Sequence, residues 1–327
     1  MDKKAKDVKF SIIIPVYNCE NFIEKCINSI ISQKYTNWEL IVVDDGSSDN
    51  SLCLCKNIAE QSDKIRVFHK ENGGVSSARN YALNKISGDY LLFVDSDDML
   101  TSDCLNNLYS TIINIRPDVC FHKYGIIRGS NIEYPINDAT TVSVETAIEN
   151  IYDTFIDNWI LFSATWSKCY KISTIKKFNI RFAESINLYE DFLFLTYFLS
   201  HSKLVYITTN IGYLYRVVKN SLSRKANQDI CKCIKFVLNE IDKSSSNSFV
   251  VDSYKLLINQ ILIIRYCELD KGTRYKIIDI CKHYNLCNFR NKVLQLFNVL
   301  VKKRVGNFLI DVCTYPLIYL KHRLPKL

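Results

Sequence analysis

Three short apolar runs in the first hundred residues constrain the fold more than any other feature of the chain. They span Phe10 to Val16, Glu39 to Val43 and Tyr90 to Val94. Each run is nearly unbroken and rich in β-branched or aromatic side chains, which is typical of strands covered on both faces. Between them, apolar side chains recur at helical spacing from Phe22 to Ile31 and from Val75 to Ile86. This alternation predicts a parallel α/β sheet with right-handed crossovers.

The length of the chain allows one large domain with additions or two domains of modest size. It has 327 residues, against a usual figure of roughly 150 per domain. From about Ala226 onward the apolar spacing becomes helical. We therefore expect an α/β domain over residues 1–223 and a helical C-terminal subdomain over residues 224–327.

The positive charge of the chain is concentrated at its two ends. The formal net charge is +8, of which residues 1–9 carry +2 and residues 301–327 carry +5, leaving +1 for residues 10–300. A nucleic-acid-binding protein spreads basic surface over its folded body. The nearly neutral body therefore argues against nucleic acid as a partner.

The basic C-terminal segment, residues 301–327, also carries aromatic and aliphatic side chains on either side of Pro316. Cations that flank an apolar segment are typical of an interfacial anchor on an anionic membrane. The alternative is a final helix that packs on the body and leaves its charged ends in solvent. Both interpretations stay open at this point.

Neither a transmembrane helix nor a secretory signal peptide is expected. No stretch approaches about 18 consecutive apolar residues, and the first nine positions are mostly charged. The 13 cysteines are irregularly spaced, with no C-x-x-C pair to begin a zinc site. We expect reduced, mostly buried thiols in a cytoplasmic protein.

Carboxylates cluster where two of the predicted strands end. Asp44 and Asp45 follow one strand, and Asp95 and Asp97 follow another. Ligands of open parallel sheets bind beyond the carboxyl ends of the strands, and adjacent carboxylates repel one another unless a cation or a proton compensates. The Asp95–Asp97 spacing suits Mg²⁺ or Mn²⁺ with substrate phosphates completing its shell. The alternative is that these acidic turns only cap the following helices.

Six motifs follow one another in an order that resembles a known family. They are Pro15-Val16-Tyr17-Asn18, Asp44-Asp45-Gly46-Ser47-x-Asp49, Asn72-Gly73-Gly74-x-x-x-Ala78-Arg79-Asn80, Gly88-Asp89-Tyr90, Asp95-x-Asp97-Asp98 and Glu190-Asp191. With this set the chain strongly resembles the inverting nucleotide-sugar glycosyltransferases of family 2. The resemblance covers roughly residues 10–223.

The resemblance implies a GT-A fold, in which helices sandwich a Rossmann-like mixed sheet. Residues 10–100 would form the nucleotide-sugar half and residues 101–223 the acceptor half. It also implies a nucleoside diphosphate sugar as donor, most commonly a UDP-sugar, and Mn²⁺ or Mg²⁺ as cofactor. The expected acceptor is a glycan or lipid-linked oligosaccharide in surface polysaccharide synthesis, on the cytoplasmic face of the inner membrane.

The resemblance also assigns roles to individual residues. Asp191 resembles the general base that takes the acceptor proton, and Asp97 resembles the metal ligand. Residues similar to nucleotide-sugar contacts are Pro15, Tyr17, Asp44, Asp45, Arg79, Asp95, Trp166 and Arg216. For four of these an ordinary structural role is an alternative. Tyr17 could be a half-buried aromatic side chain at a strand end, and Arg79 could be a solvated charge on a helix. Trp166 could pack in the core, and Arg216 could be a solvated surface charge.

Two other classes of protein are weighed against this interpretation. A sugar nucleotidylyltransferase uses a similar sheet, but Pro15-Val16-Tyr17-Asn18 stands where its glycine- and basic-rich loop is expected. Neither a dinucleotide-binding glycine motif nor a P-loop is present. A catalytically inactive GT-A-like binding protein predicts broken acidic motifs, whereas Asp44, Asp95, Asp97 and Asp191 are intact.

Overall fold

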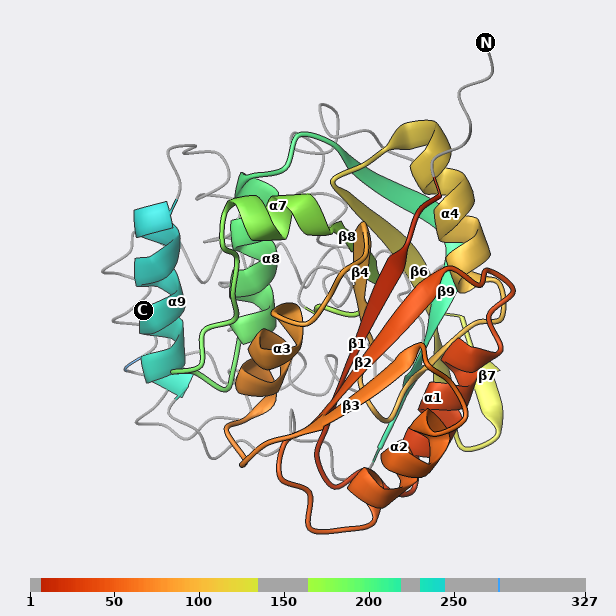
Figure 1. The fold of residues 1–327 in the computed structure, drawn as a ribbon. Helices are drawn as coiled ribbons and strands as arrows, with labels where there is room; N and C mark the ends of the chain where they lie inside the picture. The colour runs from red at the N-terminus through yellow and green to blue at the C-terminus, as the bar shows by residue number, and fades with distance from the viewer. Residues whose placement is uncertain (1–6, 135–163, 219–229, 245–275, 277–327) are drawn as a thin grey trace, which may run out of the picture. The chain divides into compact units, whose positions relative to one another are not determined.

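The computed structural model describes residues 7–134, 164–218, 230–244 and Lys276. The chain divides into two compact units, Met1–Gln228 and Asp229–Leu327, which are treated separately. Figure 1 shows the described elements as coloured ribbons. The predicted boundary after residue 223 stays a prediction.

A mixed β-sheet forms the centre of the first unit. Its strand order over the described residues is β3-β2-β1-β4-β8-β6-β9-β5, with β7 paired to β6. The strands are β1 (Phe10–Val16), β2 (Trp38–Asp44), β3 (Ile65–His69), β4 (Tyr90–Phe93), β5 (Met99–Leu100), β6 (Val119–Arg128), β7 (Asn131–Glu133), β8 (Lys168–Lys171) and β9 (Val205–Arg216). β1 to β4 run parallel, and β8 then enters antiparallel to both β4 and β6. The sheet is therefore mixed, as the resemblance implied.

Helices cover both faces of this sheet. They are α1 (Ile23–Ile31), α2 (Ser51–Ala59), α3 (Val75–Leu83), α4 (Cys104–Ile115), α7 (Ile172–Lys177) and α8 (Glu190–Ser200). In Figure 1, α1, α2 and α4 lie on one side of the strands, and α3, α7 and α8 lie on the other. The sandwiched α/β architecture expected from the sequence is confirmed.

The three apolar runs form the buried centre of the sheet. Every residue of β1, β2 and β4 is buried, because helices exclude water from both faces of these strands. α1 buries Ile23, Cys26, Ile27 and Ile30 of the apolar stripe predicted from its spacing, whereas Ile31 at the end of that stripe is exposed. The run that ends at Val43 extends one residue further in the structure, so Asp44 is the last residue of β2.

The parallel register aligns the ends of the first strands. Val16 pairs with Asp44, and Asp44 pairs with His69. β4 pairs with the other side of β1, and Val94, just after β4, donates its N–H to Ile13 O at 3.0 Å. The loops after β1, β2, β3 and β4 therefore emerge at one edge of the sheet, where ligands of open α/β sheets bind.

The described helix of the second unit is α9 (Ile230–Ser244). It agrees with the helical spacing predicted there, while the rest of the predicted subdomain and the basic tail lie outside the described residues. Across the part of the chain that the structure describes, no helix is both long and apolar enough to cross a bilayer.

Candidate functional site

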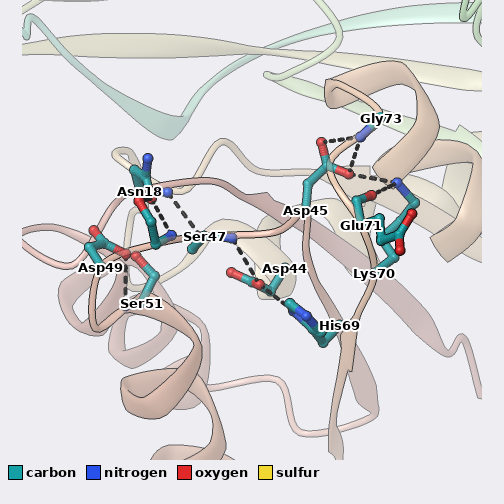
Figure 2. Close-up of polar contacts among 11 residues, drawn as sticks. Asn18, Asp44, Asp45, Ser47, Asp49, Ser51, His69, Lys70, Glu71 and Gly73 are labelled. Atoms are coloured by element: carbon teal, nitrogen blue, oxygen red, sulfur yellow. Dashed lines mark hydrogen bonds and ion pairs between the residues drawn. The ribbon is translucent and has the colours of Figure 1, made fainter.

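The loops after β1 and β2 are tied together at the carboxyl edge of the sheet. Asn18 adopts a left-handed backbone, with φ of 48°. Its N–H donates to Ser47 Oγ at 3.0 Å, and its Oδ1 accepts from the Ser48 N–H at 2.8 Å, as Figure 2 shows. These bonds hold Tyr17, which is 47% exposed, at the end of β1, where Pro15 is buried. An exposed aromatic side chain at this position offers a face for a ligand ring.

Asp44 is fully buried and has one carboxylate oxygen unused. Its Oδ2 accepts from His69 Nδ1 at 2.7 Å and from the Ser47 N–H at 3.2 Å. Its Oδ1 has no hydrogen-bond partner among the described residues. A buried acceptor without a donor is destabilising. Asp44 Oδ1 is therefore a natural contact for an N–H group of a ligand.

Asp45 has a different environment from its neighbour. One of its oxygens pairs with Lys70 Nζ at 2.7 Å and accepts from the Gly73 N–H at 3.0 Å. The other accepts from the Gly74 N–H at 2.7 Å, just before α3 begins. The structure thus places Asp45 as the residue that fixes the glycine turn and the start of α3 (Figure 2).

Arg79, on α3, is enclosed by carboxylates. It is 3% exposed, and its two terminal nitrogens donate to Asp191 Oδ1 at 2.5 Å and to Asp95 Oδ1 at 3.0 Å. Glu190 Oε1 lies 4.0 Å from the same guanidinium. Burial opposes the charged form, but these carboxylates outweigh it and raise the pKa of Arg79. The structure therefore places Arg79 between the predicted donor contact Asp95 and the predicted base Asp191.

The loop after β4 carries three aspartates within residues 95–98 and is called the acidic loop. Asp98 anchors this acidic loop to β9. Its Oδ2 accepts from the Tyr213 hydroxyl at 2.7 Å, and its Oδ1 accepts from the Arg216 N–H at 2.6 Å. The Tyr213 hydroxyl also accepts from the Asp95 N–H at 3.1 Å. Arg216 Nε donates to Asp97 O at 2.9 Å. The predicted nucleotide-sugar contact Arg216 and the predicted metal ligand Asp97 are thus neighbours.

Asp97 has the chemistry of a ligand for a hard cation. Burial, and to a lesser extent the nearby Asp95 carboxylate, raises its pKa to about 6. Within the described ranges no cationic side chain forms an ion pair with Asp97, and no three His, Cys, Asp or Glu side chains gather into a metal-binding group. Carboxylate oxygen suits Mg²⁺ or Mn²⁺, which keep several ligands from water or substrate phosphates. The residues present fit such an ion with Asp97 as one ligand.

Glu190 and Asp191 begin α8, where the helix N-terminus favours negative charge. The Asp191 carboxylate is 21% exposed, so a substrate hydroxyl can approach it. Glu190 is more enclosed, and burial together with the Asp191 charge raises its pKa to about 7. The two neighbours therefore differ in environment, and Asp191, the predicted base, is the more exposed of the two carboxylates.

Trp166 lies in an aromatic cluster. Its indole stacks on the rings of Tyr213 and Tyr215 with centroids 4.9 and 5.4 Å apart, and it meets Tyr124 edge-on. Only 6% of Trp166 is exposed. Nearby Lys168 is completely buried and donates to Ala164 O and Trp166 O, and this burial lowers its pKa to about 7. Trp166 therefore packs against Tyr213, whose hydroxyl bonds to Asp98 and to the Asp95 N–H in the acidic loop.

The sequence motifs did not reveal two residues that the structure places in the site. His69 is the last residue of β3, and its partner Asp44 is set by the parallel register. Tyr213 lies on β9, 115 residues beyond Asp98. For His69 a signal existed, since it is a polar residue at a strand end. For Tyr213 the signal was its place three residues before the predicted contact Arg216, whereas its bond to Asp98 depends on the tertiary structure.

Residues 11–178 match the sequence model of Glycosyl transferase family 2. Glycosyltransferase GlyA of Streptococcus pneumoniae serotype 4 is 36% identical over 226 residues, which cover 67% of this chain and 32% of GlyA. Poly(ribitol-phosphate) beta-N-acetylglucosaminyltransferase TarS of Staphylococcus aureus is 28% identical over 211 residues, covering 64% of this chain and 35% of TarS. The chain thus spans about a third of the length of these two relatives.

Two solved structures share the fold. S. aureus TarS 1–349 in complex with UDP-GlcNAc has a TM-score of 0.70 at 22% identity, covering 84% of this chain and 80% of that one. The mannosyltransferase PcManGT from Pyrobaculum calidifontis, in complex with GDP-Man and Mn²⁺, has a TM-score of 0.55 at 12% identity, covering 94% and 84%. The match to the family model covers residues 11–178, and the mixed sheet is that of the TarS structure. The chain therefore belongs to Glycosyl transferase family 2 and has the GT-A fold.

Proposed function

We propose that this protein is an inverting glycosyltransferase. It transfers one sugar from a nucleoside diphosphate sugar to a hydroxyl of a glycan or lipid-linked oligosaccharide. The family and the fold support this reaction class, and TarS, which resembles the chain in sequence and fold, carries UDP-GlcNAc in its structure. A UDP-sugar is therefore the donor we favour.

The observation that carries the proposal is the bridge from Asp95 through Arg79 to Asp191. A sugar hydroxyl is a weak nucleophile, so a carboxylate must take its proton as it attacks the anomeric carbon. Asp191 performs this step, and the Arg79 guanidinium orients its carboxylate by holding one oxygen. The attack comes from the face opposite the diphosphate, so a single displacement inverts the anomeric centre.

On the donor side, Tyr17 covers one face of the nucleobase and Asp44 binds an N–H of its edge. Pro15 backs this pocket from within β1, and Asp45 holds the glycine turn beside it. Arg216 lies next to the acidic loop, where it can pair with diphosphate oxygens. Trp166 shapes the site through its stack on Tyr213.

Asp97 would hold the divalent cation, Mn²⁺ or Mg²⁺, and Asp95 beside it would bind the ribose. When bound, such an ion stabilises the negative charge of a leaving diphosphate. Support for this assignment comes from the hard carboxylate oxygens of Asp97 and from the Asp95 carboxylate that acts on it. PcManGT, which shares the fold, is a structure with Mn²⁺.

We further propose that the acceptor belongs to surface polysaccharide synthesis and that the enzyme works on the cytoplasmic face of a membrane. The name of TarS, a poly(ribitol-phosphate) transferase, supports a polymer acceptor. The basic and aromatic composition of residues 301–327 supports a peripheral membrane contact.

Donor hydrolysis tests the reaction directly, with water standing in for the unknown acceptor. Purified protein is first screened with UDP- and GDP-sugars and Mn²⁺ by thermal shift, since a bound donor raises the melting temperature. Nucleotide release is then measured for Asp191→Asn, which we expect to be about a hundredfold slower or more with donor affinity retained. Asp103→Asn, an exposed carboxylate paired with Lys34, is the matched control with unchanged rate. Full activity of Asp191→Asn would remove the base assignment, and the absence of any donor-dependent shift would remove the proposed reaction.

A further inference from the structure

The carboxylate of Asp44 receives two donors on the same oxygen. His69 Nδ1 and the Ser47 N–H both bond to Oδ2, at 2.7 and 3.2 Å, and Figure 2 shows them converging on it. Each carboxylate oxygen has about two lone-pair sites. Oδ2 is therefore saturated by the protein itself.

The fold fixes this arrangement. Asp44 and His69 are register partners at the ends of the parallel strands β2 and β3, so their side chains share one face of the sheet. Ser47 lies in the turn that leaves β2, and its hydroxyl is bonded to the Asn18 N–H. Asp44 consequently has no freedom to rotate its saturated oxygen outward without losing two hydrogen bonds.

Only Oδ1 of Asp44 remains available as an acceptor. It is buried and has no partner among the described residues. Because Asp44 is 0% exposed, a base reaches this oxygen only after neighbouring atoms move. The oxygen is already stripped of water, so a donor that reaches it gains a hydrogen bond without a further desolvation cost.

Nucleobases differ in how many donors they present to such a carboxylate. Uracil has a single ring N–H flanked by two carbonyl acceptors. Guanine has a ring N–H beside an exocyclic amine, and this pair of donors matches a carboxylate with both oxygens free. A carboxylate that offers one oxygen satisfies the uracil edge and leaves one guanine donor unpaired.

We propose that His69 is a positioning residue that determines base specificity, because its bond to Asp44 Oδ2 leaves a single acceptor suited to uracil and unsuited to guanine. This inference rests on the proposed function and adds to it a residue that selects the base. His69 acts through Asp44, and its own side chain is 51% exposed.

The test compares UDP and GDP binding to the full 327-residue chain by calorimetric titration in Mn²⁺. We expect the wild type to bind UDP at least about tenfold more tightly, the order of one hydrogen bond to a charged group. His69→Leu removes one of the two donors to Oδ2, which opens one acceptor position on that oxygen, and lowers this ratio by about tenfold. His69→Asn keeps a donor near the position of Nδ1 and preserves the ratio.

A matched control separates the base contact from the loop around it. Lys70 pairs with Asp45 in the same loop, so Lys70→Met weakens UDP and GDP binding together and leaves their ratio unchanged. If the wild type prefers UDP and His69→Leu does not reduce this preference, the role of His69 is wrong while the proposed function stands. The same holds if Lys70→Met lowers the ratio of UDP to GDP affinity as much as His69→Leu does. Wild-type protein that binds neither nucleotide would overturn the proposed function as well.

Discussion

Arg79 on α3 donates a hydrogen bond of 2.5 Å to Asp191 on α8, which lies 112 residues further along the chain. The same guanidinium is bonded to Asp95 in the acidic loop. One buried cation therefore joins the predicted donor side of the site to the predicted base. The sequence motifs suggested a contact of Arg79 with the nucleotide, whereas this geometry favours a role in positioning the base.

Replacing Arg79 distinguishes these two roles. Arg79→Met leaves three carboxylates around a cavity without a cation, and breaking a buried pair in this way costs about 3 kcal/mol of unfolding free energy. If Arg79 positions Asp191, kcat for donor hydrolysis falls by about a hundredfold while the Kd for UDP changes little. Arg79→Lys keeps the positive charge but lacks the two parallel N–H donors of a guanidinium. Compared with Arg79→Met, it should therefore restore more of the free energy of unfolding than of kcat. A large loss of UDP affinity with unchanged kcat would instead support the nucleotide contact.

Removing the charge of Asp97 tests the metal assignment. Asp97→Asn is expected to raise the Mn²⁺ concentration needed for half-maximal activity by at least about tenfold, because the ligand loses its charge. The measurement is the hydrolysis rate as Mn²⁺ is titrated, with Asp103→Asn as the control. The same Mn²⁺ dependence in both variants would exclude Asp97 as a ligand.

Glu39 lies at the opposite end of β2 from Asp44, and its ionisation is expected to make the free energy of unfolding depend on pH in the acid range. Burial opposes its ionisation, but hydrogen bonds from Ser11, Ser87 and Lys9 outweigh burial and lower its pKa to about 2. Because the folded pKa lies below the unfolded one, Glu39 stabilises the protein above about pH 4.5 and loses this effect as the pH falls toward 2. Glu39→Gln is therefore expected to lose on the order of 3 kcal/mol at pH 7.

Urea unfolding of wild type and Glu39→Gln at pH 7 and at pH 3 measures this contribution. The difference between the two proteins should shrink at pH 3, because much of the stabilisation has then been lost from the wild type. An undiminished difference at pH 3 would show that the substitution acts through packing and not through ionisation of Glu39.

Deletion of residues 301–327 tests the proposed membrane contact of a segment that lies outside the described residues. The full chain should sediment with anionic vesicles and the shortened chain should not, because each basic residue near such a surface contributes about 1 kcal/mol. Vesicles of phosphatidylcholine alone are the control, and high salt should release the full chain. Equal sedimentation of both chains would refute the anchor.

The first half of the fold could be predicted because its signals are local. The apolar runs of β1, β2 and β4 correctly predicted strands that are buried on both faces, and the helical spacing of α1 predicted which of its side chains face the core. Since parallel strands send their carboxyl ends to one edge, the placement of Asp44 and Asp95 at the same edge of the sheet followed from the same pattern. These inferences require only that neighbours in sequence are neighbours in a strand or helix.

The orientation of each side chain at that edge was decided by contacts between distant segments. Asp44 and Asp45 are adjacent in the sequence, yet their side chains have different partners. Asp44 bonds to His69 and keeps one buried oxygen without a partner among the described residues, whereas Asp45 accepts hydrogen bonds from the glycine turn. Trp166 stacks on tyrosines of β9, and Arg79 is held by a carboxylate on another helix. Periodicity gives the side of an element on which a residue lies. Which charge or ring it meets there depends on how separate elements pack, and only the tertiary structure determines that.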